Sequence, residues 1–138
     1  LPIWGVLLAE AGAVVISGGR GGVMRASCAG AASRGGQAVG LLPGRDRSQG
    51  NEFLTIALPT GLGEMRNFLV VNTADAVIAI GGAWGTLSEI ALARRAGKPL
   101  VAIESWTLSQ PGVDAPLLTA TTPEEAVSLA LAGIVRET

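Results

Sequence analysis

Short, continuously apolar runs alternate along the chain with longer segments in which apolar residues recur at helical spacing. Runs of about five apolar residues, such as residues 76–80, predict strands that are buried on both faces of a sheet. The longer segments end at or near glycine, as helices commonly do. The predicted strands are residues 13–17, 37–42, 53–58, 76–80, 99–103 and 116–119, and the predicted helices are residues 1–12, 23–33, 63–73, 86–96 and 123–132. The last helix is expected to have Thr122 as its N-cap and Pro123 in its first position.

This alternation predicts the fold class. Strands that alternate with helices imply right-handed crossovers and a mostly parallel sheet. We therefore expect an α/β fold: residues 1–138 as a single three-layer, Rossmann-like domain that binds a nucleotide or phosphate, with helices on both faces of the sheet. No strand precedes the first predicted helix, whereas the first strand of a doubly wound domain usually lies in the middle of the sheet. Either the sheet is built without that strand, or a preceding segment supplies it.

The composition excludes several classes of function. A chain of 138 residues suffices for one domain with a sizeable core, and its formal net charge of −1 favours neither nucleic acid nor an anionic membrane as a partner. No apolar run is long enough to span a bilayer. The absence of histidine excludes histidine-based catalysis and most zinc sites, so no metal site is predicted. The one cysteine, Cys28, is expected to pack on a helix. We also predict a cytoplasmic protein.

Glycine is about twice as frequent as usual, with 20 residues, and two glycine clusters directly follow predicted strands. In parallel sheets, ligands bind at the carboxyl ends of the strands. In the second cluster, Gly81, Gly82 and Gly85 permit a sharp turn and a close approach of backbone to ligand. The amides of residues 85–87 then begin a predicted helix and, together with its dipole, form an anion site to which Thr86 adds a hydroxyl.

Two features of this turn have alternative interpretations. Residues 86–89 (Thr-Leu-Ser-Glu) also match a capping box, in which Glu89 folds back to the amide of Thr86. A phosphate and a capping box would compete for the same amide. Trp84 is a candidate stacking surface for a base or ring, and it is equally a candidate for packing or for a subunit contact.

The first cluster, residues 17–24, lacks the features of a dinucleotide or P-loop site. The strand after it ends in Leu42 and Pro43, so no acidic residue is there to bind a ribose, and the P-loop lysine is absent. Arg20 in this cluster is expected to be a solvated loop residue.

Arg66 lies at the start of its predicted helix, where its positive charge opposes the helix dipole. This unfavourable position indicates a phosphate or carboxylate partner.

The alternative for Arg66 is a surface arginine paired with Glu64 or Asp75.

Three segments together resemble the Lonely Guy-like superfamily, in which they occur in the same order. They are residues 17–24 (SGGRGGVM), 61–67 (GLGEMRN) and 81–89 (GGAWGTLSE). The superfamily includes cytokinin riboside 5′-monophosphate phosphoribohydrolases and molybdenum cofactor carrier proteins. The resemblance implies that the ligand-binding residues are Gly18, Gly19, Gly21, Met24, Asn67, Gly81, Gly82, Trp84, Gly85 and Thr86.

The resemblance implies two functions. Arg66 and Glu89 match the catalytic arginine and glutamate of the phosphoribohydrolases, which would hydrolyse a nucleoside 5′-monophosphate to the free base and ribose 5-phosphate. Asn67 replaces the lysine of those enzymes and looks closer to the carrier branch. The alternative is therefore a non-catalytic carrier of the molybdenum cofactor, with molybdopterin as its ligand.

The superfamily has also been labelled lysine decarboxylase-like, and the residues argue against that activity. Pyridoxal phosphate needs a lysine for its Schiff base. The one lysine, Lys98, is predicted at the opposite end of a strand from the glycine clusters. We expect no decarboxylase activity and no required cofactor. The expected partners are a small phosphorylated ligand and further copies of the chain, because helices rich in alanine and leucine, such as residues 89–96, suggest a dimer or larger homo-oligomer.

Overall fold

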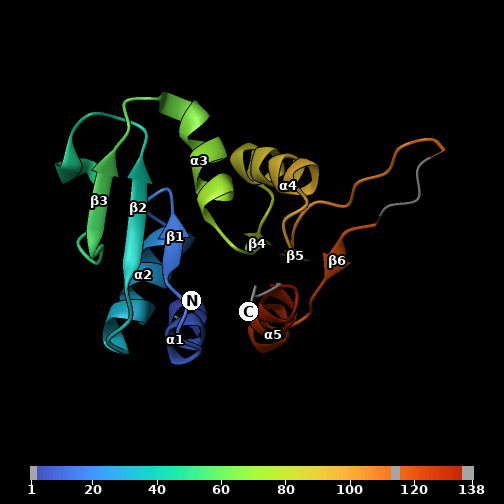
Figure 1. Ribbon diagram of the computed structural model, residues 1–138, viewed down its shortest axis with the longest axis horizontal. Helices are drawn as coiled ribbons and strands as arrows, with labels where there is room; N and C mark the ends of the chain where they lie inside the picture. The colour runs from blue at the N-terminus through green and yellow to red at the C-terminus, as the bar shows by residue number, and fades with distance from the viewer. Residues whose placement is uncertain (1–2, 113–115, 135–138) are drawn as a thin grey trace. The chain divides into compact units, whose positions relative to one another are not determined.

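The computed structural model describes residues 3–112 and 116–134. The chain folds as two compact units, Leu1–Thr73 and Ala74–Thr138. In both units parallel strands are flanked by helices, so the predicted Rossmann-like α/β fold class is confirmed (Figure 1). A single domain over residues 1–138 stays a prediction. None of the described helices is long and apolar enough to cross a membrane.

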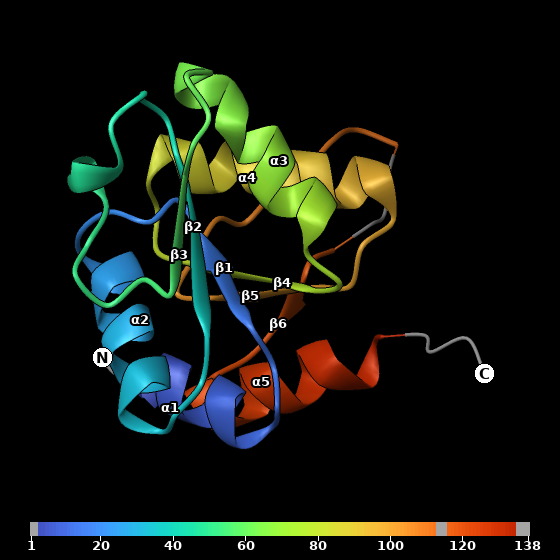
Figure 2. The ribbon, with the colours of Figure 1, turned by 60° about the vertical axis from the view of Figure 1, so that its left-hand side comes forward.

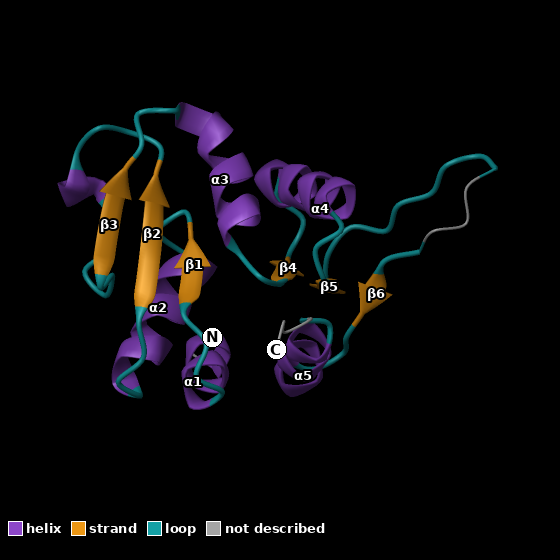
Figure 3. Cartoon of the chain, in the orientation of Figure 1, coloured by secondary structure: helices purple, strands orange, loops and turns teal. Residues whose placement is uncertain are grey.

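The first unit contains three parallel strands in the order β1-β2-β3. Their arrows point the same way in Figure 3, so the loops that follow them lie at one edge of the sheet. Figure 2 shows the α1–α2 pair and α3 on different sides of these strands. The elements are α1 (Ile3–Glu10), β1 (Val15–Ser17), α2 (Val23–Ser33), β2 (Ala38–Leu42), η1 (Arg47–Gln49), β3 (Ile56–Pro59), η2 (Gly63–Met65) and α3 (Arg66–Thr73).

The core of the first unit lies between α2 and the strands. Val15, Cys28, Ala31 and Ala38 form a buried cluster, so Cys28 packs on a helix as predicted. The neighbouring helices approach closely at Gly5, where an added Cβ would lie only 1.8 Å from the carbonyl oxygen of Ser27.

The second unit also has three parallel strands, in the order β4-β5-β6. Its two helices pack on β4 and β5 from opposite faces, with α4 above and α5 below these strands in Figure 1. As predicted, the hydroxyl of Thr122 caps α5 by accepting a hydrogen bond from the amide of Glu125, and Pro123 opens the helix. The elements are β4 (Val77–Ile80), α4 (Trp84–Ala96), β5 (Leu100–Ile103), β6 (Leu118–Thr119) and α5 (Pro123–Ala132).

Most predicted elements are present, with differences at their ends. The first helix spans Ile3–Glu10, and the first two residues of its predicted range lie outside the described residues. The strand predicted at residues 53–58 is found at Ile56–Pro59, because the Asn51 side chain accepts from the amide of Phe53 and forms a turn there. The helix predicted at residues 86–96 begins two residues earlier, at Trp84.

Gly5→Ala should lower the free energy of unfolding by about 1–3 kcal/mol or more, because the added methyl group meets backbone atoms that cannot move independently. Urea unfolding followed by circular dichroism measures this change. The matched control is Gly21→Ala, since a Cβ at Gly21 meets no described atom within 4 Å and should change stability by less than about 0.5 kcal/mol. Equal stability of both variants would contradict the described packing of α1 on α2.

Candidate functional site

The first glycine cluster forms a tight turn at the carboxyl end of β1. The amide of Gly19 donates to the Ser17 hydroxyl oxygen at 3.1 Å. Gly19 has φ +75°, and a Cβ there would lie 2.9 Å from the Cα of Gly40 on the adjacent strand. Only glycine fits both the conformation and the close approach.

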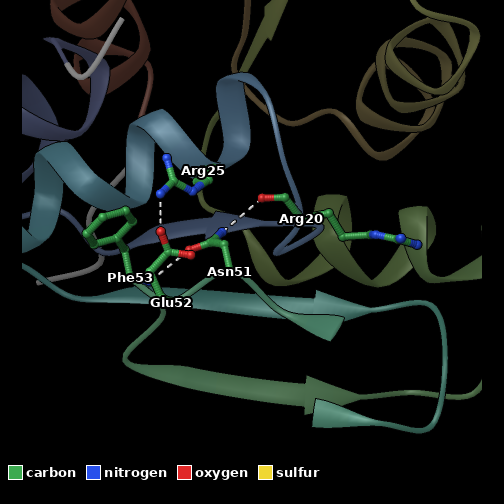
Figure 4. A network of polar contacts seen from close by, with 5 residues as sticks. All are labelled: Arg20, Arg25, Asn51, Glu52 and Phe53. Carbon is green, nitrogen blue, oxygen red and sulfur yellow. Dashed lines mark hydrogen bonds and ion pairs between the residues drawn. The ribbon is translucent and has the colours of Figure 1, made fainter. Parts of the chain in front are cut away.

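Asn51, in the loop before β3, holds this turn in place. Its backbone amide donates to the Gly19 carbonyl oxygen at 2.8 Å. Its side-chain Nδ2 donates to the Arg20 carbonyl oxygen at 3.0 Å, the bond that Figure 4 draws. The Arg20 side chain is exposed, as expected for a solvated loop residue. Sequence reasoning missed Asn51, because nothing in a polar loop identifies a partner about thirty residues away.

An ion pair fastens the same loop to α2. Arg25 pairs with Glu52, and its guanidinium lies 5.0 Å from the centroid of the Phe53 ring (Figure 4). The hydrogen bond from Arg25 lowers the pKa of the Glu52 carboxyl below its usual value, so the pair stays ionised to a lower pH. Because both side chains are exposed, the pair contributes little to stability, and its effect is local positioning.

Arg66, the first residue of α3, is buried, with 9% of its surface exposed. Its guanidinium lies over Gly18: a Cβ at Gly18 would be 2.7 Å from Cζ and from both terminal nitrogens. One terminal nitrogen donates to the Oδ1 of Asn67 at 2.5 Å. The Nε atom is buried and has no hydrogen-bond partner within residues 3–112 and 116–134.

This arrangement leaves a buried cation in contact with an uncharged amide. Buried charges are normally paired, and a buried donor without an acceptor costs about 1–3 kcal/mol. Glu10 and Glu52 of the same unit form ion pairs with Arg34 and Arg25. The interpretation of Arg66 as a surface arginine is therefore wrong, because the side chain is buried and hydrogen-bonded to Asn67.

The remaining predicted ligand residues of the first unit lie around the start of α2. Gly21 is exposed, and Met24 is half-buried in the first turn of the helix. Their ligand-binding role stays a prediction.

The second glycine cluster turns the chain from β4 into α4. Gly81 has φ +80°, and a Cβ added at Gly81 or Gly82 would have no atom within 4 Å in the part of the chain that the structure describes. The N-cap residue is Ala83, which offers no capping side chain. Thr86 is thus the third residue of α4, so the alternative in which it is the N-cap of a capping box is wrong.

The earlier start of α4 also changes which amides are available. The Leu87 amide donates to the Ala83 carbonyl oxygen at 3.1 Å, so it is used within the helix. The amides of the first turn are those of Trp84, Gly85 and Thr86, which by position lack intrahelical acceptors. The free amides predicted at residues 85–87 are therefore found one residue earlier, at residues 84–86. Glu89 is half-buried one turn further along α4.

Two residues that follow β5 support this second turn, and no local sequence signal identifies them. The Ser105 hydroxyl donates to the Gly81 carbonyl oxygen at 2.7 Å, and the Trp106 Nε1 donates to the Ala83 carbonyl oxygen at 3.2 Å. The rings of Trp84 and Trp106 lie 5.0 Å apart, centroid to centroid, at an interplanar angle of 44°.

Lys98 lies away from this turn. It precedes β5, at the amino ends of the strands of its unit, and its Nζ donates to the Ala74 carbonyl oxygen at 2.7 Å. Within residues 3–112 and 116–134, no three histidine, cysteine or acidic side chains lie together as ligands of a metal ion would.

The predicted site residues thus fall into two groups. The first unit brings together Gly18, Gly19, Arg66 and Asn67, and the second unit places Gly81, Gly82, Trp84, Gly85, Thr86 and Glu89 on one turn and helix. The proposed catalytic pair, Arg66 and Glu89, is divided between the two units.

The profile of one protein family, the SLOG cluster4 family, matches residues 3–128. The chain belongs to the SLOG cluster4 family. This membership confirms the resemblance to the Lonely Guy-like superfamily that the three motifs indicated.

Relatives of this SLOG cluster4 protein include an uncharacterised protein of Archaeoglobus fulgidus, which is 42% identical over 132 residues, covering 96% of this chain and 83% of that protein. Among solved structures, the molybdenum cofactor binding protein from Rippkaea orientalis is 32% identical with a TM-score of 0.84 over 95% of this chain and 83% of its own. The molybdenum cofactor carrier protein from Chlamydomonas reinhardtii is 30% identical with a TM-score of 0.80 over 95% and 85%.

Asn51→Ala should lower the free energy of unfolding by about 1–2 kcal/mol and loosen the first glycine turn, because two side-chain hydrogen bonds are lost. Urea unfolding measures the first effect, and hydrogen exchange at the amides of residues 19–22 measures the second. Gln37→Ala, which removes an exposed amide side chain, is the control and should leave both unchanged. Unaltered exchange in Asn51→Ala would show that Asn51 does not hold the turn.

Proposed function

We propose that this SLOG cluster4 protein binds a phosphorylated small molecule, with Arg66 as the residue that holds the phosphate. The observation that carries the proposal is the buried guanidinium, which lies over Gly18 and whose Nε has no acceptor among the residues that the structure describes. A guanidinium has five N–H donors in a planar fork that matches a phosphate or carboxylate group. An anion beside Gly18 would satisfy the free donor and neutralise the buried charge.

The neighbours of Arg66 support an anionic ligand. Asn67 orients the guanidinium by accepting a hydrogen bond, but an amide leaves the positive charge unneutralised, whereas a carboxylate would neutralise it. Gly18 has no side chain to cover the guanidinium. The turn follows the carboxyl end of β1, where parallel sheets bind their ligands.

We further propose that the ligand is the molybdenum cofactor, held as cargo by a non-catalytic carrier. Two solved structures at 30–32% identity over 95% of this chain are named for binding or carrying that cofactor. Asn67, at the position of the lysine in the phosphoribohydrolases, agrees with this branch. The fit of this cofactor to the protein depends on Arg66, because its buried Nε–H donor suits the phosphate of a molybdopterin-type ligand.

A phosphoribohydrolase is the second candidate, because Arg66 and Glu89 match the catalytic pair of those enzymes. A carboxylate beside the sugar would stabilise the positive charge that develops as the glycosidic bond breaks. Glu89 is half-buried in α4, which suits a carboxylate that acts in a site shielded from water.

We also expect this protein to form a homo-oligomer. Several large apolar side chains of the first unit are exposed, including Met65 at 74% and Phe68 at 54%. Light scattering during gel filtration gives the mass of the assembly.

Protein purified from a host that makes molybdopterin should carry a pterin that mass spectrometry detects, and Arg66→Gln should lose it. The loss of charge-assisted hydrogen bonds corresponds to roughly ten- to 150-fold weaker binding of ribose 5-phosphate, measured by calorimetry. Arg66→Lys keeps the charge without the fork and should bind with intermediate strength. The matched control, Arg20→Gln, removes an exposed arginine from the same turn and should bind like the wild type.

Circular dichroism verifies that each variant is folded. Equal binding by wild type and by folded Arg66→Gln would refute the phosphate role of Arg66. Phosphate binding without any bound pterin would refute the choice of cargo alone.

Incubation with AMP separates the carrier from the enzyme. The carrier proposal predicts no release of free adenine at micromolar protein concentration while nucleotide still binds, as chromatography of the products would show. Glu89→Gln is the diagnostic variant, because it removes the carboxylate but keeps the shape of the side chain. Adenine release that disappears in Glu89→Gln would replace the carrier proposal with the hydrolase.

A further inference from the structure

The second unit carries a pair of indole rings beyond the ends of its strands, of which Trp84 is exposed and Trp106 is half-buried. Trp84 is 77% exposed, the highest value among the large apolar side chains in the described part of the chain. Its partner in the pair, Trp106, follows β5, and both residues lie beyond the carboxyl ends of adjacent parallel strands. An indole left this exposed forgoes most of the free energy that its burial would provide.

The pair is held in a defined arrangement. Trp106 donates its ring N–H to the Ala83 carbonyl oxygen, and Ser105 donates to the Gly81 carbonyl oxygen, so the loop after β5 is tied to the glycine turn. Glu104, directly before them, has φ +47°, the one positive φ at a non-glycine residue among those the structure describes. Strained backbone of this kind costs about 1–3 kcal/mol and clusters at functional sites.

We propose that Trp84 and Trp106 form a stacking site for the planar, nitrogen-containing aromatic ring of a small molecule. Aromatic side chains bind such rings through their faces. The tilt of 44° between the indoles means that neither ring covers the whole face of the other. Much of the Trp84 surface therefore stays open to a ligand ring.

The surroundings favour a small heteroaromatic ring over a protein partner. Two indoles provide far less area than the roughly 800 Å² per partner of a stable protein interface. Space is open beside Gly81 and Gly82, where an added Cβ would meet no atom of the described residues within 4 Å. A ring edge can approach the backbone there, and a heterocycle with its own donors and acceptors can bond to peptide groups as a hydrocarbon cannot.

All residues of this stacking site belong to the second unit, whereas Arg66 belongs to the first. The stacking site is argued from the indole pair, and the choice of a pterin as its probe rests on the proposed function. Two probes therefore test the two proposals separately: an uncharged pterin for the ring, and ribose 5-phosphate for the anion.

Calorimetric titration of the full chain with 6-hydroxymethylpterin should show binding, and the fluorescence of Trp84 and Trp106 should be quenched. Trp84→Leu, which keeps an apolar side chain but removes the ring, should weaken pterin binding roughly five- to 150-fold. Trp84→Phe keeps an aromatic face and should retain most of the affinity. Phe68→Leu removes an exposed aromatic ring from the first unit and should bind the pterin like the wild type.

The two probes should respond to different variants. Trp84→Leu should leave the affinity for ribose 5-phosphate unchanged, and Arg66→Gln should leave the affinity for 6-hydroxymethylpterin, which carries no phosphate, unchanged. Failure of the pterin to bind, or equal binding by wild type and Trp84→Leu, would overturn the stacking site. A lower assembly mass of Trp84→Leu in light scattering, with pterin affinity unchanged, would also overturn it and assign the indoles to a contact between copies.

Discussion

The buried guanidinium of Arg66 over Gly18 is the interaction on which this account depends. It brings the start of α3 against the turn after β1, and it requires a residue without a side chain at position 18. Asn67 holds the guanidinium in place and leaves its charge intact. The Nε donor of this buried guanidinium has no acceptor within residues 3–112 and 116–134, so the arrangement makes physical sense when an anion completes it.

The features that the sequence predicted are those set by neighbouring residues. Apolar runs identify the strands, since a strand buried on both faces must be apolar throughout. Thr122 and Pro123 identify the start of α5, since capping involves residues three positions apart. The two glycine clusters mark the turns after β1 and β4, where the backbone adopts a positive φ that other residues disfavour.

Contacts between distant residues escaped prediction. Asn51 supports a turn about thirty residues earlier, and Trp106 bonds to a carbonyl oxygen more than twenty residues before it. Neither has a local signal, because a hydrogen bond to a backbone carbonyl needs no special partner. The start of α4 at Trp84 was also missed, since Ala83 offers no capping side chain to mark it. An arginine at a helix start resembles a solvated residue, and only the fold shows that Arg66 is buried.

The most direct measurement is the NMR signal of the Arg66 Nε–H group during titration with ribose 5-phosphate, assigned by its loss in Arg66→Lys. We expect a large shift that saturates with the calorimetric affinity, because this proton, which has no acceptor among the described residues, gains one from the ligand. An unmoved Nε–H signal in protein that is saturated with ligand would place the anion elsewhere and contradict the role of Arg66.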